Sequence, residues 1–153
     1  MVITGSTRAS AGVYEDKSGP VIASALAALE FEVDGPLIVP DGDEVGQALR
    51  DGVQQGYAVI ITTGGTGLNP HDHTPEQTRA VLDYDVPQLA AAVASYGVEH
   101  GVPTAVLSRG LSGVSGSSLI VNLPGSSGGA RDGMAVLGPV LAHAVSQIRG
   151  GDH

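Results

Sequence analysis

The chain has 153 residues, of which 42% are hydrophobic, 3% are aromatic and none is cysteine or tryptophan. This length suits one domain with a substantial core, and we expect residues 1–153 to form that single domain. Sixteen acidic residues against seven basic ones give a net charge of −9, which excludes a basic surface for nucleic acid. The lack of cysteine excludes disulfides and thiolate chemistry.

No apolar run approaches the roughly 18 residues that a membrane-spanning helix needs, and no stretch resembles a signal peptide. We therefore expect a cytoplasmic protein with no membrane partner. The first strand is short at its beginning, so we also expect a few N-terminal residues to be missing.

Strand patterns and helix patterns alternate along the chain. Apolar runs predict strands at residues 1–5, 37–39, 57–61, 105–107 and 119–121, and residues 6–17 read as a polar loop. Capping residues and helical spacing predict helices that begin at Ser18 and Asp43, cover 74–82 and 86–99, and run from 129 to 148. We expect Pro139 to kink the last helix. The alternation predicts an α/β fold, a three-layer αβα sandwich with a mostly parallel central sheet.

Polar or glycine-rich loops follow four of the predicted strands. They cover residues 6–8, 40–42, 63–72 and 122–126. The carboxyl ends of parallel strands meet at one edge of the sheet, where open α/β sheets bind ligands. We therefore expect these loops to converge on one pocket.

The loop after the third predicted strand carries the strongest functional signal. It reads Thr62-Thr63-Gly64-Gly65-Thr66-Gly67 and leads to a helix start, with Thr74 as N-cap and Pro75 at the first position. Glycine lets a backbone approach a ligand closely, and exposed N–H groups hold phosphate. A Walker loop is excluded because no Gly-Lys-Ser/Thr follows, and a dinucleotide fingerprint because Pro70 replaces its last glycine. A tight turn without a ligand is the alternative.

Several motifs, in order along nearly the whole chain, resemble the MogA/MoaB family of molybdopterin-binding proteins. They are the loop at 62–67, the Asp-x-Thr-Pro-Glu cluster at 72–76, and the segments 6–16, 39–41, 107–109 and 122–126. The likeness is strongest to the MogA branch, the molybdopterin adenylyltransferases of molybdenum-cofactor synthesis. Three places depart from the pattern: Thr7 stands where the family often has aspartate, Ser115 where it frequently has arginine, and residues 127–129 where it has a more basic, less flexible stretch.

The resemblance implies an enzyme whose substrates are molybdopterin and ATP. The terminal phosphate of molybdopterin attacks the α-phosphorus of ATP, pyrophosphate leaves, and Mg²⁺ shields the triphosphate. It also implies a homotrimer and a molybdenum insertase as a possible partner.

The matched motifs imply the residues of the site. Asp41 and Asp72 match the family's two catalytic carboxylates and are implied as Mg²⁺ ligands. The implied molybdopterin- and phosphate-binding residues are Thr63, Gly64, Gly65, Thr66, Gly67, Thr74, Glu76, Ser108, Arg109, Asn122, Pro124 and Gly125. Ser6 and Arg8 are implied to bind the nucleotide. Thr74 and Glu76 equally suit a helix cap, and Arg109 equally suits a surface salt bridge.

Two other classes of function stay open. The first is a non-catalytic molybdopterin carrier or scaffold, which turnover of ATP would separate from the enzyme. The second is a zinc hydrolase that uses His71, Asp72 and His73, with His100 or His143 as a further ligand. A serine hydrolase is disfavoured because no Gly-x-Ser-x-Gly occurs.

Overall fold

The structure is a computed structural model that describes residues 1–152. Six strands form one sheet in the order β2-β1-β3-β6-β5-β4. The strands are β1 (Val2–Gly5), β2 (Leu37–Val39), β3 (Val59–Thr63), β4 (Tyr84–Asp85), β5 (Ser112–Ser115) and β6 (Ser118–Leu123). The first four in spatial order are parallel, whereas β5 and β4 run antiparallel to their neighbours. The predicted three-layer sandwich with a mostly parallel sheet is confirmed.

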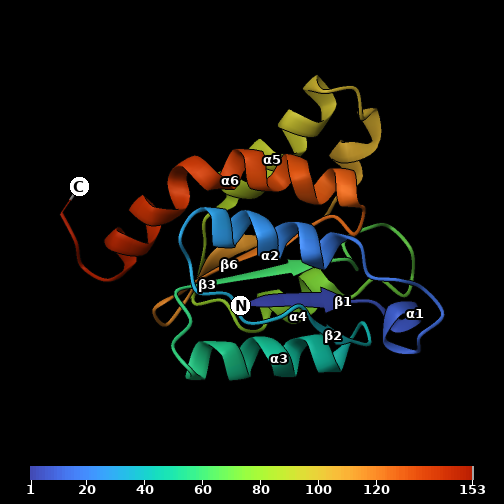
Figure 1. Ribbon diagram of the computed structural model, residues 1–153, viewed down its shortest axis with the longest axis horizontal. Helices are drawn as coiled ribbons and strands as arrows, with labels where there is room; N and C mark the ends of the chain where they lie inside the picture. Colours follow the sequence, from blue (N-terminus) through green and yellow to red (C-terminus); the bar gives the residue numbers. More distant parts are fainter. Residues whose placement is uncertain (153) are drawn as a thin grey trace.

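Helices cover both faces of the sheet (Figure 1). They are α1 (Thr7–Ser10), α2 (Ser18–Ala28), α3 (Asp43–Gln54), α4 (Thr74–Arg79), α5 (Pro87–Glu99) and α6 (Ser127–Ile148), with the 3₁₀ helix η1 (Pro103–Leu107). Within residues 1–152, no helix is both long enough and apolar enough to cross a membrane.

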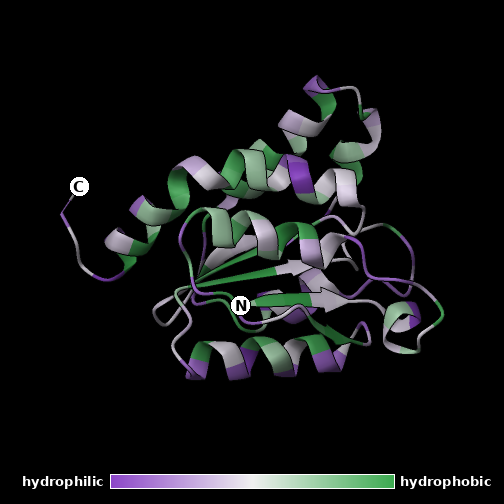
Figure 2. Ribbon diagram, viewed as in Figure 1, coloured by the Kyte–Doolittle hydropathy of each residue, from purple (hydrophilic) through white to green (hydrophobic). Residues whose placement is uncertain are grey.

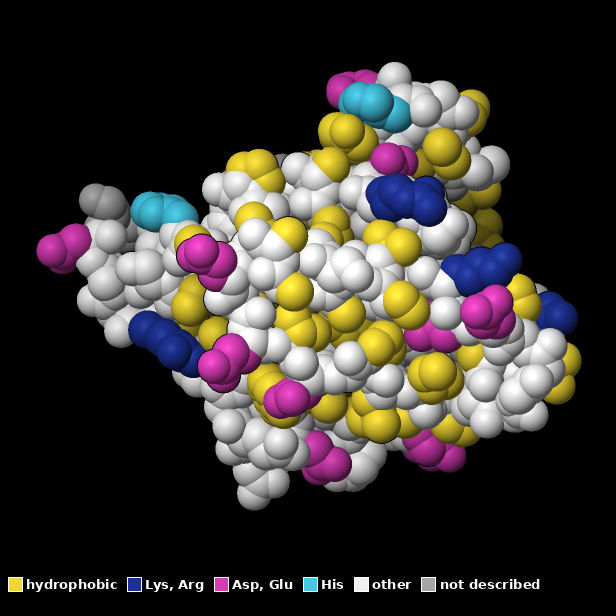
Figure 3. All heavy atoms as spheres, viewed as in Figure 1, with side chains coloured by type: hydrophobic (Ala, Val, Ile, Leu, Met, Phe, Trp, Pro, Cys, Tyr) yellow, Lys and Arg dark blue, Asp and Glu magenta, His cyan; other side chains and the backbone are white. Residues whose placement is uncertain are grey.

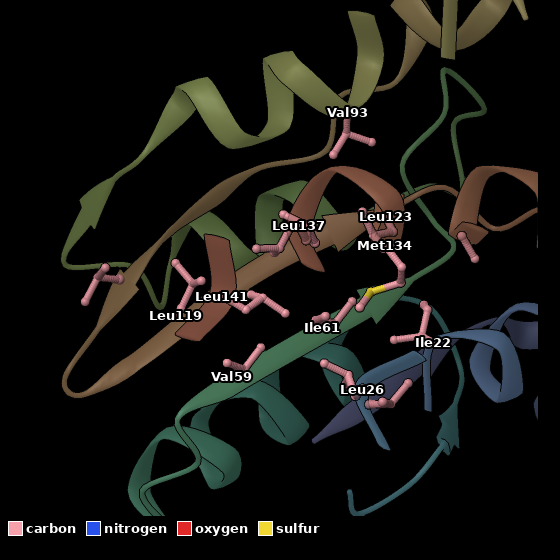
Figure 4. Close-up of a cluster of buried hydrophobic side chains, with 14 residues drawn as sticks. Ile22, Leu26, Val59, Ile61, Val93, Leu119, Leu123, Met134, Leu137 and Leu141 are labelled. Carbon is pink, nitrogen blue, oxygen red and sulfur yellow. The ribbon is translucent and has the colours of Figure 1, made fainter. Parts of the chain in front are cut away.

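Two hydrophobic clusters hold the layers together. On one face of the sheet, Ile61 of β3 packs with Leu26 of α2 and Leu137 of α6 (Figure 4). On the other face, the neighbouring Ile60 packs with Leu49 of α3. Successive side chains of a strand point to opposite faces, so an unbroken apolar strand supplies both clusters. The strands and the inner sides of the helices are accordingly the hydrophobic parts of the ribbon, and hydrophilic residues gather in the loops (Figure 2).

Residues 105–107 do not form the predicted strand. They belong to η1, and Val106 is 63% exposed. Pro103 starts this turn because its fixed φ suits a helical first position and its missing N–H cannot join a sheet. The place beside β6 is taken by β5, whose sequence Ser-Gly-Val-Ser has no apolar run and was not predicted. The two-residue strand β4 was also missed.

Helix boundaries differ from the predictions, most clearly in three places. Part of the predicted loop 6–17 forms α1, because the Ser6 hydroxyl accepts a hydrogen bond from the Ala9 N–H at 3.1 Å and caps one turn. Helix α4 begins with Thr74 inside it and His73 as its N-cap, and it ends at Arg79 instead of residue 82. Helix α6 starts at Ser127, two residues early, and is continuous through Pro139.

Candidate functional site at the carboxyl edge of the sheet

The loops that follow β1, β2, β3 and β6 meet at one edge of the sheet, towards which the arrowheads of β1 and β3 point (Figure 1). Two hollows open there. The larger hollow, of about 920 Å³, is bounded by the glycine loop, the segments around Ser108 and Pro124, and helices α5 and α6. The smaller hollow, of about 640 Å³, is bounded by the glycine loop, α1 and the loop that holds Asp41. Gly65, Asp72 and Gly125 line both hollows, so the glycine loop is the wall between them.

Glycines 64 and 65 are needed for the fold of this wall. Gly64 has φ 94° and Gly65 has φ 64°, in the left-handed region that side chains with a Cβ rarely adopt. A Cβ on Gly65 would lie 2.4 Å from both Asp41 Oδ2 and Thr74 Oγ1. The glycine therefore allows a carboxylate to reach the backbone of the loop.

Asp41 is held by donors on the far side of the loop. Its Oδ2 accepts a hydrogen bond from the His73 N–H at 3.2 Å, and its Oδ1 accepts one from the Thr74 hydroxyl at 3.3 Å. Burial raises the pKa of the Asp41 carboxyl; hydrogen bonds from His73, Thr74 and Gly42 oppose this rise, and the charge of Asp72 adds to it. The two carboxylates therefore lie close enough to repel each other.

Asp72 and Asp41 fit a magnesium ion better than a zinc ion. Both carboxylates line the smaller hollow, and Mg²⁺ is commonly held by one or two carboxylates together with substrate phosphates and water. A catalytic zinc site needs three protein ligands. Across residues 1–152, no group of three or more histidine, cysteine, aspartate or glutamate side chains gathers around one point. The His71-Asp72-His73 zinc hypothesis therefore gains no support from the described residues, and His100 instead stacks on Tyr96 in α5.

Arg109 points into the loop that carries Asp72. Its Nε donates to the Gly67 carbonyl oxygen at 2.9 Å, and one terminal nitrogen donates to the Asp72 carbonyl oxygen at 2.9 Å. The other terminal nitrogen forms an ion pair with Glu76, which lowers the pKa of that carboxyl. Arg109, Glu76 and Thr74 line neither hollow.

Asn122 and Thr63 direct their hydrogen bonds to the protein. The Asn122 side chain is 3% exposed; its Nδ2 donates to the hydroxyls of Thr62 and Thr78, both at 2.9 Å. Thr63 Oγ1 donates to the Pro124 carbonyl oxygen at 2.7 Å. These bonds tie the ends of β3 and β6 together, so they fix the walls of the site.

The remaining predicted residues divide between the hollows. Ser108 and Pro124 line the larger hollow, with Thr66 and Gly67, whereas Ser6 and Arg8 line the smaller hollow, with Thr63 and Gly64. The strand-end loops therefore converge as predicted, but on two adjacent hollows instead of one.

Sequence reasoning missed two site residues. Tyr14 lines the smaller hollow, with the Arg8 guanidinium 5.7 Å from the centre of its ring. Arg131 lines the larger hollow from the first turns of α6. Tyr14 is the one aromatic residue of the 6–17 segment, which was a usable signal. Arg131 gave none, because its position depends on where α6 starts.

Two of the departures from the family pattern have local roles. The Thr7 Oγ1 accepts a hydrogen bond from the Asp41 N–H at 3.3 Å, so this position supports the Asp41 turn. The Ser115 hydroxyl donates to the Val81 carbonyl oxygen at 2.8 Å, which ties β5 to the turn that follows α4.

A mostly parallel α/β sandwich with a glycine loop between two hollows at its carboxyl edge defines a protein that binds small molecules at that edge. The chain belongs to the molybdopterin-binding family: the family model described as "Probable molybdopterin binding domain" matches residues 1–143. The resemblance to the MogA/MoaB family is thereby confirmed.

Known proteins are similar over most of the chain. The molybdopterin adenylyltransferase of Helicobacter pylori strain J99 is 34% identical, over 97% of this chain and 86% of its own length. The structure of the Mog protein of Mycobacterium ulcerans is 53% identical and covers 96% of each chain, with a TM-score of 0.92. The structure of MoaB from Thermus thermophilus is 42% identical over 97% of this chain and 94% of its own, with a TM-score of 0.90. The chain spans only 23% and 48% of two longer curated relatives.

Proposed function

We propose that the protein is a molybdopterin adenylyltransferase of molybdenum-cofactor synthesis, which transfers AMP from ATP to the terminal phosphate of molybdopterin and releases pyrophosphate. Family membership and the name of the similar Helicobacter pylori enzyme support this reaction. The observation that carries it is the pair of hollows that share Gly65, Asp72 and Gly125. Two separate substrate spaces with a common wall suit a transfer reaction better than storage of one ligand.

We assign the larger hollow to molybdopterin and the smaller one to ATP. The larger hollow is lined by the predicted molybdopterin-binding residues Ser108, Asn122 and Pro124 and by Arg131. The smaller hollow contains Ser6 and Arg8, and the exposed ring of Tyr14 offers a flat face on which adenine can stack. The reacting phosphates then meet at the glycine loop.

The chain's contribution to the reaction is positioning and charge balance. A terminal oxygen of the molybdopterin phosphate forms the new bond to the α-phosphorus of ATP, and the bond from that phosphorus to the oxygen that leaves with pyrophosphate breaks. Backbone N–H groups of residues 65–67 stabilise the crowded negative charge, whereas the Gly64 N–H donates to the Leu123 carbonyl oxygen. Asp41 and Asp72 would hold Mg²⁺, which when bound supplies positive charge to the triphosphate.

The assembly and setting of the enzyme follow from the same family relation. We propose that residues 1–153 act as one domain, that three copies form the working enzyme, and that it operates in the cytoplasm. We also propose that the adenylylated product passes to a molybdenum insertase.

The deciding experiment is incubation with molybdopterin, Mg²⁺ and ATP, followed by detection of adenylylated molybdopterin and pyrophosphate. We expect both products in equal amounts, and neither when ATP is omitted. Tight binding of molybdopterin without consumption of ATP would instead identify a carrier.

A further inference from the structure

The loop from Gly65 to Thr74 carries Asp72. A hydrogen bond joins the two ends of this loop, and the Arg109 side chain lies between them. The Thr74 N–H donates to the Gly65 carbonyl oxygen at 3.2 Å, which joins the two ends of the loop. Inside it, the Arg109 side chain bonds the carbonyl oxygens of Gly67 and Asp72, and the Arg109 backbone N–H donates to the Thr66 carbonyl oxygen at 2.8 Å. Arg109 therefore holds this loop together from the inside, through hydrogen bonds to three of its carbonyl oxygens.

The two carbonyl groups that the guanidinium holds belong to residues that touch each other. A Cβ on Gly67 would lie 2.7 Å from Asp72 Oδ2, so the Asp72 carboxylate packs directly against the Gly67 backbone. Holding both backbones at once fixes the distance between them. It thereby fixes where the Asp72 carboxylate stands at the wall between the hollows.

All three nitrogen atoms of the guanidinium have protein partners. Nε and one terminal nitrogen bond the two carbonyl groups, and the other terminal nitrogen bonds Glu76. The Arg109 side chain is 34% exposed and lies outside the lining of both hollows. An arginine that grips a substrate phosphate would line a hollow, and Arg109 lines neither of the two.

We propose that Arg109, oriented by Glu76, is a positioning residue that sets the Asp72 carboxylate for adenylyl transfer. This inference rests on the proposed function for its reaction but on the loop geometry for its mechanism. A planar fork with fixed donor directions spans three separated acceptors, whereas a lysine ammonium presents its donors at a single point. Arg109→Lys therefore keeps the charge and loses the geometry.

The kinetic test compares Arg109→Lys, Glu76→Gln, Asp72→Asn and the double variant Asp72→Asn/Arg109→Lys. Arg50→Lys is the matched control, because Arg50 lies exposed on α3 and donates to the neighbouring Gln47 on the same helix. At saturating Mg²⁺, we expect Arg109→Lys to lower kcat about tenfold or more with little change in either KM, because a misplaced group lowers the rate more than it weakens substrate binding. We expect Glu76→Gln to act in the same direction but less. In the Asp72→Asn background, Arg109→Lys should change kcat no further.

A second measurement reads the site without turnover. Mn²⁺ binding is followed by electron paramagnetic resonance with ATP present and molybdopterin absent, and amide hydrogen exchange is followed in residues 66–74. We expect Arg109→Lys to weaken Mn²⁺ binding and to speed exchange in this segment, while Arg50→Lys changes neither. Glu76→Gln changes only the exposed ion pair with Arg109, so it is the variant on which the same two measurements are made if Arg109→Lys does not fold.

Three results would overturn the inference. One is a raised KM for ATP or molybdopterin with unchanged kcat in Arg109→Lys, which identifies a direct phosphate contact. The second is an Arg109→Lys effect that persists in full after Asp72→Asn. The third is unchanged exchange in residues 66–74. Failure of the wild-type protein to form adenylylated molybdopterin would overturn the proposed function instead, and the exchange measurement would still decide whether Arg109 holds the loop.

Discussion

Asp41 and Asp72 contact different glycines of one loop, and their surroundings differ. Asp41 packs against Gly65 and receives hydrogen bonds from His73 and Thr74, whereas Asp72 packs against Gly67. Asp41 is also desolvated, which raises its pKa and makes its charge unfavourable to the fold. A destabilising charge at the wall of a pocket is typical of a group kept for chemistry.

We expect Asp41→Asn to remove most adenylyl transfer while leaving the thermal midpoint at pH 7 unchanged or about 2 °C higher. The amide can accept from the His73 N–H and donate to the Thr74 hydroxyl, so both contacts survive. Because the folded-state pKa of Asp41 is raised, the wild type loses stability as pH rises through the interval between the unfolded and folded values.

The stabilities of the wild type and Asp41→Asn should therefore converge below the unfolded pKa of about 3.8, where Asp41 is neutral in the folded and the unfolded state. Calorimetry of both proteins across pH, with turnover measured in parallel, provides the check. A lower midpoint for Asp41→Asn at pH 7 would mean that the carboxylate serves the turn more than the reaction.

We expect Asp72→Asn to retain molybdopterin affinity and to lose about 10²-fold in kcat, the usual scale for removing one group that stabilises transition-state charge. Asp72 is at the wall shared by both hollows, and asparagine is close to aspartate in size, so the substitution leaves the walls of the larger hollow in place. Equilibrium binding of molybdopterin and the rate of pyrophosphate release measure the two effects. Unchanged turnover would remove Asp72 from the reaction.

At the scale of elements, the glycine loop joins a buried strand to a short helix and carries the wall between the hollows. The sequence predicted that its glycines serve a ligand, and this stays a prediction; the structure shows that they serve packing. Gly64 and Gly65 have positive φ, and a Cβ at either would collide with Gly5 or with Asp41 and Thr74. A substitution here affects fold and site together.

We expect Gly65→Ala to destabilise the protein by about 2 kcal/mol and to weaken ATP binding, because the new methyl group displaces Asp41. Gly12→Ala is the matched control. Gly12 has φ 74°, close to the 64° of Gly65, but a Cβ there meets nothing within 4 Å. Chemical denaturation of both variants separates the collision with Asp41 from the backbone strain that they share. Equal losses of stability would show that the close contact costs nothing.

At the scale of the whole molecule, negative charge dominates. Acidic side chains are spread over the face shown in Figure 3, with fewer basic ones among them, and the net charge of the chain is −9. The guanidinium of Arg109 is committed to its loop, which leaves Arg8 as the arginine that lines the smaller hollow. The protein alone supplies little positive charge for a triphosphate.

We therefore expect molybdopterin to bind measurably in a chelator, while ATP binds appreciably only when Mg²⁺ is added. Calorimetric titration of each ligand with and without Mg²⁺ makes the comparison, and AMP provides a control with less phosphate charge. Equal affinity for ATP in both conditions would show that loop N–H groups and Arg8 suffice, and that Asp41 and Asp72 have another role.

The sequence alone determined the layers, the parallel core of the sheet and the edge at which the site lies. These features follow from local patterns: unbroken apolar strands such as 59–61, helical spacing after each strand, and glycine-rich strand ends. The signature at 62–67 and 72–76 also identified the family, because both motifs are intact.

Only the tertiary structure decided which groups serve the fold and which face a ligand. Asn122 and Arg109 are polar residues at the predicted site, yet their bonds go to Thr62 and Thr78 and to Gly67 and Asp72. No local pattern reveals such partners, because they lie 37 to 60 residues away along the chain. The strand predicted at 105–107 was wrong for a different reason: β6 pairs with the neighbouring β5 in a local hairpin, and the Ser-Gly-Val-Ser sequence of β5 has no apolar run that would reveal it. Long-range hydrogen bonding, which a single sequence does not display, decided the roles of Asn122 and Arg109.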